Sequence, residues 1–242
     1  MTADLRRLWQ EAFGDSKETL DNFAATGYSP DRCHYLSENE IPVSALYWFD
    51  CQLDGRKLAY IYAVATLKPH RGQGLAQKLM AETHEILRSQ GYAGAILVPE
   101  EGLFPFYKKI GYKTVSKIHR FVCQAAGEPV ALREIDTAEF ARLRRKFLPP
   151  GGVIQEGATL AWLHTYGKFY AGENFLLSAA EEENTLLVQE FLGDSALSGR
   201  ILTALGMANG IFCTPGTSQD FAMLLPLTED CPTPAYFGLA LD

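Results

Sequence analysis

A glycine-rich loop stands between a predicted strand and a predicted helix, and it constrains this chain more than any other feature. The segment reads IYAVATLKPHRGQGLA over residues 61–76. Glycine lets the backbone approach a ligand closely, and the free N–H groups of a first helical turn form a binding site for anions. Arg71 adds a positive charge at the mouth of the loop. The segment therefore predicts a cradle for a pyrophosphate group.

Two other kinds of phosphate loop are excluded by the same residues. A Walker-type loop requires Gly-Lys-Ser/Thr, which does not follow here, and a dinucleotide fingerprint requires three glycines at a different spacing. Tight turns and helix caps also produce glycine clusters. A purely structural role for Gly72 and Gly74, and a solvated surface role for Arg71, therefore stay open at this point.

The hydrophobic periodicity predicts a mixed α/β organisation for the first half of the chain. Apolar residues follow helical spacing near the N-terminus and after the glycine loop, and short β-type runs lie between these two regions. Asp54-Gly55 predicts a hairpin turn. The predicted elements are helices over 5–13 and 16–25, strands over 33–36, 43–51 and 58–67, a helix over 75–90, a strand over 94–98, a helix over 103–110 and a strand over 112–123.

A small, polar, proline-bearing segment over residues 124–129 is the best candidate for a linker. We therefore predict two domains, residues 1–126 and residues 127–242. The second half again alternates helical and strand patterns in an order that echoes the first half, although no sequence repeat is visible. A shared fold is thus an expectation for the second domain.

The net charge of −7 is divided unevenly between the two predicted domains. Residues 1–126 carry a net charge of +1, and residues 127–242 carry −8. Proteins that bind nucleic acid normally carry a basic stripe, so this acidic chain is not expected to do so. An acidic half can instead attract cationic ligands.

Membrane spans, export signals and metal sites are also not expected. The longest apolar run, near residues 58–67, is far shorter than the ~20 residues that cross a bilayer. The first residues become acidic and amphipathic where a signal peptide needs an apolar core. We therefore expect a cytoplasmic protein. The five cysteines are an odd number without a Cys-x-x-Cys pair, which favours free thiols and no metal site.

A second motif lies downstream of the glycine loop, where residues 104–112 read FPFYKKIGY. Together with RGQGLA over residues 71–76, it resembles the GCN5-related N-acetyltransferase (GNAT) superfamily, whose motifs are Arg/Gln-x-x-Gly-x-Gly/Ala and Phe-Tyr-x-x-x-Gly-Phe/Tyr. The resemblance covers residues 45–115 well. It implies a GNAT-type α/β fold, with a mixed, mostly antiparallel central sheet flanked by helices, and acetyl-CoA as co-substrate.

The resemblance also implies roles for individual residues. Backbone groups of Val64, Ala65 and Thr66 would form hydrogen bonds with the pantetheine amides, so that the pantetheine arm lies beside them like an added strand. Tyr107 matches the tyrosine that donates a proton to the departing thiolate of CoA, although a core aromatic is its alternative role. The loop residues that would hold the pyrophosphate are Arg71, Gly72, Gln73, Gly74, Ala76 and Gln77.

Some positions depart from the family pattern. Members often carry Asn and Ala where this chain has Glu100 and Leu103, which puts an asparagine contact to the cofactor in doubt. No general base can be identified. Glu100 and Glu101 follow a predicted strand, and a solvated loop pair is the simpler interpretation of both.

The N-terminal sequence LWQEAFGD and the two-part chain also resemble enhanced-intracellular-survival-type acetyltransferases. In those proteins a degenerate second GNAT-like domain follows the first, and the terminal carboxylate serves as a base. The resemblance therefore implies a degenerate GNAT-like α/β fold for residues 127–242 and a catalytic role for Asp242. This chain lacks room for the third domain of those proteins.

We predict an N-acetyltransferase that moves an acetyl group from acetyl-CoA directly to a primary amine of a small molecule or peptide. The acidic second half would favour a cationic acceptor. A non-catalytic acyl-CoA-binding regulatory module is the alternative, because no base is identified. In a third interpretation, the second half binds a partner protein that the first half acetylates.

Overall fold

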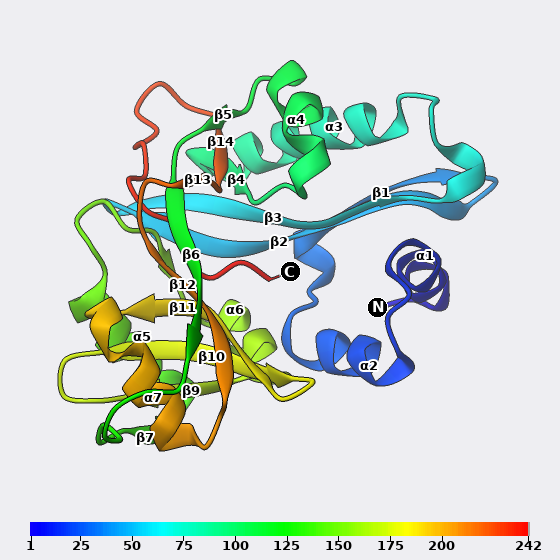
Figure 1. The fold of residues 1–242 in the computed structure, drawn as a ribbon. Helices are drawn as coiled ribbons and strands as arrows, with labels where there is room; N and C mark the ends of the chain where they lie inside the picture. The colour runs from blue at the N-terminus through cyan, green and yellow to red at the C-terminus, as the bar shows by residue number, and fades with distance from the viewer. Residues whose placement is uncertain (242) are drawn as a thin grey trace. The chain divides into compact units, whose positions relative to one another are not determined.

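The computed structural model describes residues 1–241, which form two compact units, each built around one sheet (Figure 1). Unit 1 comprises Met1–Lys113, Gly157–Trp162 and Met223–Pro232. Unit 2 comprises Thr114–Glu156, Leu163–Ala222 and the segment from Thr233 onward. No helix of the described residues is long and apolar enough to cross a membrane.

The sheet of unit 1 is mostly antiparallel. Its strand order is β1-β2-β3-β4-β14-β5, and the chain passes from unit 1 to unit 2 within β5. The pairs β1-β2, β2-β3 and β4-β14 are antiparallel, whereas β3 and β4 run parallel. The strands are β1 (Cys33–Glu38), β2 (Ile41–Leu53), β3 (Arg56–Thr66), β4 (Gly94–Leu97), β5 (Lys113–Thr114) and β14 (Met223–Pro226).

The helices of unit 1 cover both faces of this sheet (Figure 1). Side chains alternate along β2, so Leu46 and Trp48 pack with α3, whereas Val43 and Ala45 pack with α1. The predicted helices and strands are confirmed here within a few residues, apart from the strand predicted over 112–123. The helices are α1 (Ala3–Phe13), α2 (Lys17–Thr26), α3 (Leu75–Ser89), α4 (Phe104–Lys109) and α6 (Ala158–Leu163), whose last residue belongs to unit 2.

Unit 2 is built around a second mixed sheet with the order β13-β6-β12-β11-β10-β9-β7. Strands β11 and β12 run parallel, and the helix α7 connects them. The elements are β6 (Lys117–Gln124), β7 (Arg133–Ile135), α5 (Thr137–Phe147), β8 (Ile154–Gln155), β9 (Lys168–Ala171), β10 (Leu176–Glu182), β11 (Thr185–Leu192), α7 (Ser198–Leu205), β12 (Asn209–Pro215) and β13 (Gln219–Asp220).

The two units repeat one arrangement of elements. In unit 1 the hairpin β2-β3 leads through α3 to β4, which lies parallel to β3. In unit 2 the hairpin β10-β11 leads through α7 to β12, which lies parallel to β11. The shared fold expected for the second half is thus present, although the two halves share no visible sequence repeat.

The division of the chain differs from the single boundary predicted at residue 126. The strand predicted over 112–123 is broken into β5 and β6, and β6 pairs with β12 in unit 2. Near the other end of the chain, β14 returns to unit 1 and pairs with β4. Each unit thus contains a strand from the other side of the predicted boundary. Strand pairing between segments far apart in the sequence causes this, and a local change of composition does not reveal it.

A buried ion pair stabilises the interior of unit 2. Arg144 of α5 and Glu190 of β11 are 2% and 1% exposed, and two hydrogen bonds of 2.6 and 2.9 Å join them. The Arg144 guanidinium also donates to the carbonyl of Val153, and the Tyr236 hydroxyl donates to Glu190 at 3.0 Å. A Cβ atom added to Gly238 would clash with the Glu190 carboxylate, so this position requires glycine.

Replacing Glu190 with glutamine should strongly destabilise unit 2. The substitution removes one charge and leaves the Arg144 guanidinium buried without a counter-charge, which typically costs about 3–5 kcal/mol. Urea unfolding of Glu190→Gln measures this loss. The exposed pair Arg145–Glu156 is the matched control, and Glu156→Gln should cost less than about 1 kcal/mol. Equal losses for both variants would contradict the importance of the buried pair.

Candidate active site

A cavity of about 600 Å³ in unit 1 brings together most of the predicted site residues. The end of β3, the glycine loop, the start of α3 and the helix α4 line it. Gln73 does not line the cavity, and its side-chain amide donates to the carbonyl of Pro69 at 3.4 Å. Asp242 lies outside the described residues. The predicted residues that line the cavity are Val64, Ala65, Thr66, Arg71, Gly72, Gly74, Ala76, Gln77 and Tyr107.

Strand β3 carries a β-bulge where it reaches the cavity. Ala45 pairs with Ala65 and Tyr47 pairs with Tyr62, so β3 has one residue more than β2 between these pairs. Within the bulge, the backbone of Ala63 has a positive φ of 49°. A bulge locally disrupts the ladder and changes the direction of the strand, and bulges are common next to active sites.

The edge of β3 that faces away from β2 is open beyond this point. Parallel pairing between β3 and β4 ends at Tyr60 and Ile96, well before β3 itself ends at Thr66. Backbone groups near the end of β3 that point away from β2 can therefore pair with an extended ligand. Ser44 is fully buried beneath this segment, and its hydroxyl donates to the carbonyl of Ala65 at 3.0 Å, which holds the strand end in place.

The N-terminus of α3 differs from the other long helix starts of unit 1. Side chains of Thr2 and Ser16 cap α1 and α2, and each of these helices has an acidic residue in its first turn. Helix α3 starts at Gly74 with no side-chain cap and no acidic residue. The first N–H groups of an α-helix have no intrahelical acceptor, so this helix end is available for an anion.

The two loop glycines are required by backbone conformation. Gly72 and Gly74 both have a φ of 77°, in the left-handed region that ordinary residues avoid. A Cβ atom on either residue would meet nothing within 4 Å, so crowding is not the reason. Arg71 is anchored to the end of the strand, because its Nε donates to the carbonyl of Thr66 at 2.9 Å. The loop therefore presents backbone N–H groups and a guanidinium to the same cavity.

Tyr107 lines the same cavity from α4 and is 6% exposed. Burial raises the pKa of its hydroxyl to about 12, and the negative charge of Glu100 adds to this effect. Within residues 1–241, no group forms a hydrogen bond with this hydroxyl. The phenol is thus protonated at physiological pH and has its donor free for a ligand.

The positions that depart from the family pattern also lie in this cavity. Both Glu100 and Leu103 line it. Glu100 thus belongs to the wall of the site, whereas the sequence favoured a solvated loop residue at this position. Further residues that line the cavity were not predicted from the sequence, namely Ala12 and Phe13 at the end of α1, and Phe106 and Lys109 of α4. No local motif marks Ala12 and Phe13, because the fold brings α1 to the loop from far away in the sequence. In the structure, Phe13 is an exposed apolar residue at the end of α1, which its place in the sequence pattern of an amphipathic helix did not indicate.

The corresponding helix start in unit 2 is built differently. A short turn, Ser195–Leu197, precedes α7, and the side chain of Asp194 caps this turn by accepting a hydrogen bond from the Ala196 N–H, whereas α7 itself has no side-chain cap. The first turn of α7 is also covered, because the Ala126 N–H donates to the carbonyl of Gly199 at 3.1 Å. These contacts distinguish the start of α7 from the start of α3.

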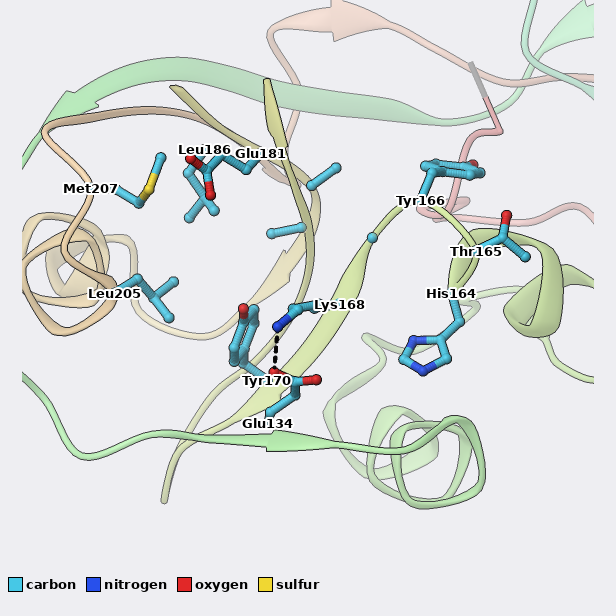
Figure 2. Close-up of a pocket in the computed structure, with 13 residues that line it drawn as sticks. Glu134, His164, Thr165, Tyr166, Lys168, Tyr170, Glu181, Leu186, Leu205 and Met207 are labelled. Atoms are coloured by element: carbon cyan, nitrogen blue, oxygen red, sulfur yellow. Dashed lines mark hydrogen bonds and ion pairs between the residues drawn. The ribbon is translucent and has the colours of Figure 1, made fainter. Parts of the chain in front are cut away.

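Unit 2 has a cavity of its own, of about 570 Å³, at the ends of β9 and β10 (Figure 2). None of the predicted site residues lines it. Lys168 and Glu134 form an exposed ion pair of 2.9 Å at its edge, and the His164 ring stacks on the ring of Phe169. The described residues contain no group of three or more His, Cys, Asp or Glu side chains that could hold a metal ion.

Comparison with known proteins agrees with the geometry of the first cavity. Residues 2–115 match the family described as an acetyltransferase (GNAT) domain, and this segment contains the loop, the bulged strand and Tyr107. Residues 2–115 form a GNAT domain. Acyl transfer is the chemistry of this family. A search of the curated proteins found no match.

Solved structures share the GNAT fold over both units. A GCN5-related N-acetyltransferase from Kribbella flavida is 20% identical with a TM-score of 0.67, and the match covers 93% of this chain and 69% of that one. Eis1 from Mycobacterium abscessus is 13% identical with a TM-score of 0.66, over 92% of this chain and 70% of its own. A protein from Pyrococcus horikoshii is 14% identical with a TM-score of 0.62, over 98% of this chain and 89% of its own. At these identities the likeness concerns the fold alone.

Replacing Gly74 with alanine should weaken the binding of CoA to this GNAT domain. A residue with a Cβ atom pays about 1–2 kcal/mol in the left-handed region, so the loop would shift and misplace its N–H groups. Isothermal titration with CoA measures the affinity. Gly91, beyond the other end of α3, also has a positive φ (78°) and open space around its Cβ position. Gly91→Ala is therefore the control, and equal affinities for the two variants would contradict the assignment of the loop.

Proposed function

We propose that this protein is an acetyl-CoA-dependent N-acetyltransferase that transfers the acetyl group directly to a primary amine. One observation carries the proposal. A single cavity is lined by an open strand edge, an uncapped helix N-terminus with an adjacent guanidinium, and a buried, protonated tyrosine. These three features suit, in this order, an extended amide chain, a pyrophosphate and a developing thiolate.

The residues fit CoA by their chemistry. The N–H groups at the start of α3, including those of Ala76 and Gln77, would bind the pyrophosphate oxygens, with Arg71 as a counter-charge. The backbone of β3 from Val64 to Thr66 would pair with the two amides of the pantetheine arm, as a peptide strand adds to an open sheet edge. Neither interaction needs a metal ion.

Acetyl transfer forms a bond from the amine nitrogen to the carbonyl carbon and breaks the bond from that carbon to sulfur. The amine loses a proton and the leaving sulfur becomes a thiolate. An ordinary thiol has a pKa of about 8.5, well below the value of about 12 for Tyr107. Complete proton transfer from Tyr107 to the thiolate would therefore be unfavourable. Tyr107 would act by donating a hydrogen bond that stabilises the charge developing on sulfur.

The acceptor that we propose is a cationic amine of a small molecule or peptide. The segment 127–242 carries a net charge of −8, and Glu100 adds a carboxylate to the cavity itself. Negative charge on a protein raises the local concentration of cations around it. The group that removes the proton from the amine is not assigned, and the role of Asp242 as a base stays a prediction.

An assay of thiol release tests the proposed activity. The full-length protein is incubated with acetyl-CoA and one of three amines, namely spermidine, tobramycin or a lysine-containing peptide, and mass spectrometry identifies the acetylated product. We expect thiol release that depends on the amine and equals the amount of product. If CoA stabilises the protein against heat but no amine releases thiol, the alternative of a non-catalytic acyl-CoA-binding module is supported instead. If CoA does not stabilise the protein against heat, both the acetyltransferase and the acyl-CoA-binding module are refuted.

Replacing Tyr107 with phenylalanine should lower kcat by roughly 10²–10⁴-fold, the range for loss of a positioned acid or hydrogen-bond donor. The affinity for CoA should hardly change, because the loop and the strand edge provide most of the binding. Steady-state kinetics and titration with CoA measure the two effects. Tyr35→Phe removes a hydroxyl from an exposed tyrosine of β1 and serves as the control. An unchanged kcat in Tyr107→Phe would remove this residue from the mechanism.

The raised pKa of Tyr107 predicts the shape of the pH profile. The phenol can donate a hydrogen bond only below its pKa, and this value is about 12. Activity should therefore rise between pH 6 and 10 as the amine loses its proton, with no decline caused by Tyr107. A profile of kcat against pH for both the wild type and Tyr107→Phe tests this. A decline near pH 9 that is present in the wild type and absent in Tyr107→Phe would contradict the prediction.

A further inference from the structure

A buried hydrogen bond lies directly behind Tyr107 and joins α3 to the residue that follows α4 and its glycine turn. His84 of α3 and Tyr112 are 6% and 1% exposed, and the His84 Nε2 and the Tyr112 hydroxyl are 2.9 Å apart. Neither residue lines the cavity. The proposed reaction thus assigns no role to either residue.

Tyr112 contacts Tyr107 in two ways. Its backbone N–H donates to the carbonyl of Tyr107 at 3.0 Å, across a turn at Gly111 with a φ of 100°. Its ring meets the Tyr107 ring edge to face, with centroids 5.7 Å apart and an interplanar angle of 72°. The ring of Tyr112 is therefore one wall of the space in which the ring of Tyr107 is held.

His84 gives the Tyr112 ring a fixed anchor. Burial lowers the pKa of His84 to about 4, and the positive charge of Arg88, one turn along α3, adds to this effect. The imidazole is thus neutral at physiological pH and shares a single hydrogen bond with the phenol. An aromatic ring alone would fill the space, whereas the hydroxyl also fixes the direction of the ring.

We infer that Tyr112 and His84 are positioning residues that orient the Tyr107 hydroxyl into the cavity. This inference rests on the proposed function only in that Tyr107 acts on the leaving thiolate. The orientation itself is a property of the free protein. Since the Tyr107 hydroxyl has no hydrogen-bond partner among residues 1–241, packing holds its ring in place, and the ring of Tyr112 is part of that packing.

Nuclear magnetic resonance of protein labelled with ¹³C at the tyrosine Cζ atoms tests the orientation without any acyl transfer. The Tyr107 signal is assigned as the one that Tyr107→Phe removes. We expect this signal to shift or broaden in Tyr112→Phe and in the double variant Tyr112→Phe with His84→Leu. The double variant leaves no buried polar group unpaired, so it keeps the test valid if the single variant folds poorly. An unchanged Tyr107 signal in the double variant would overturn the inference.

Thr83→Val is the matched control for these variants. Thr83 is a fully buried residue of α3 whose hydroxyl donates to the carbonyl of Leu79 within the same helix. Its substitution removes a buried hydroxyl next to His84 in the sequence, and the hydrogen bond that is lost lies within α3. The Tyr107 signal should therefore stay unchanged in Thr83→Val. A shift as large as that in Tyr112→Phe would show a general disturbance of α3, which would also overturn the inference.

A kinetic cycle separates positioning from a merely structural role. In the otherwise wild-type protein, Tyr112→Phe should lower kcat about three- to tenfold, with the KM for acetyl-CoA unchanged. In the Tyr107→Phe protein the same substitution should have no further effect, because the group it positions is already absent. Equal losses in both backgrounds would contradict the inference. If no amine supports turnover, the proposed function fails, and the Tyr107 signal still decides the role of the pair.

Discussion

The N–H groups at the start of α3 have no acceptor within the helix, and the candidate site depends on this one constraint. Such groups require a partner, and side chains supply it at the start of α1 and α2. At α3 no side chain of the described residues caps the helix, and Gly74 lies in the left-handed conformation directly before it. The bulge in β3 and the anchoring of Arg71 to Thr66 then bring the strand edge and a positive charge to the same helix end.

The second unit shows how the same arrangement loses this capacity. Its strand, helix and parallel strand follow the order of unit 1, yet α7 is preceded by a short turn, Ser195–Leu197, which the side chain of Asp194 caps. The segment that leads from β6 toward β7 covers the first turn through Ala126. One arrangement of elements is thus preceded by a left-handed glycine at α3 and by a capped turn at α7. The difference depends on a few residues at the helix start.

Buried polar groups have different consequences in the two units. In unit 2 the Arg144–Glu190 pair, with Tyr236 and the Val153 carbonyl, satisfies charges that the core would otherwise exclude. In unit 1 the neutral pair of His84 and Tyr112 involves no charge and lies behind the ring of Tyr107. The first network connects α5, β11 and the C-terminal segment, whereas the second connects α3 to the turn after α4.

The sequence by itself determined the local parts of this protein. The hydrophobic periodicity predicted α1, α3, α4 and the strands of unit 1, and two short motifs predicted the loop and Tyr107, because helix ends and tight turns depend on nearby residues. The tertiary structure alone decided which strands pair. It placed β6 and β14 across the predicted boundary, brought Ala12 and Phe13 to the cavity and associated Glu100 with Tyr107. These contacts join residues far apart in the chain, and their energies come from burial and pairing that no local pattern encodes.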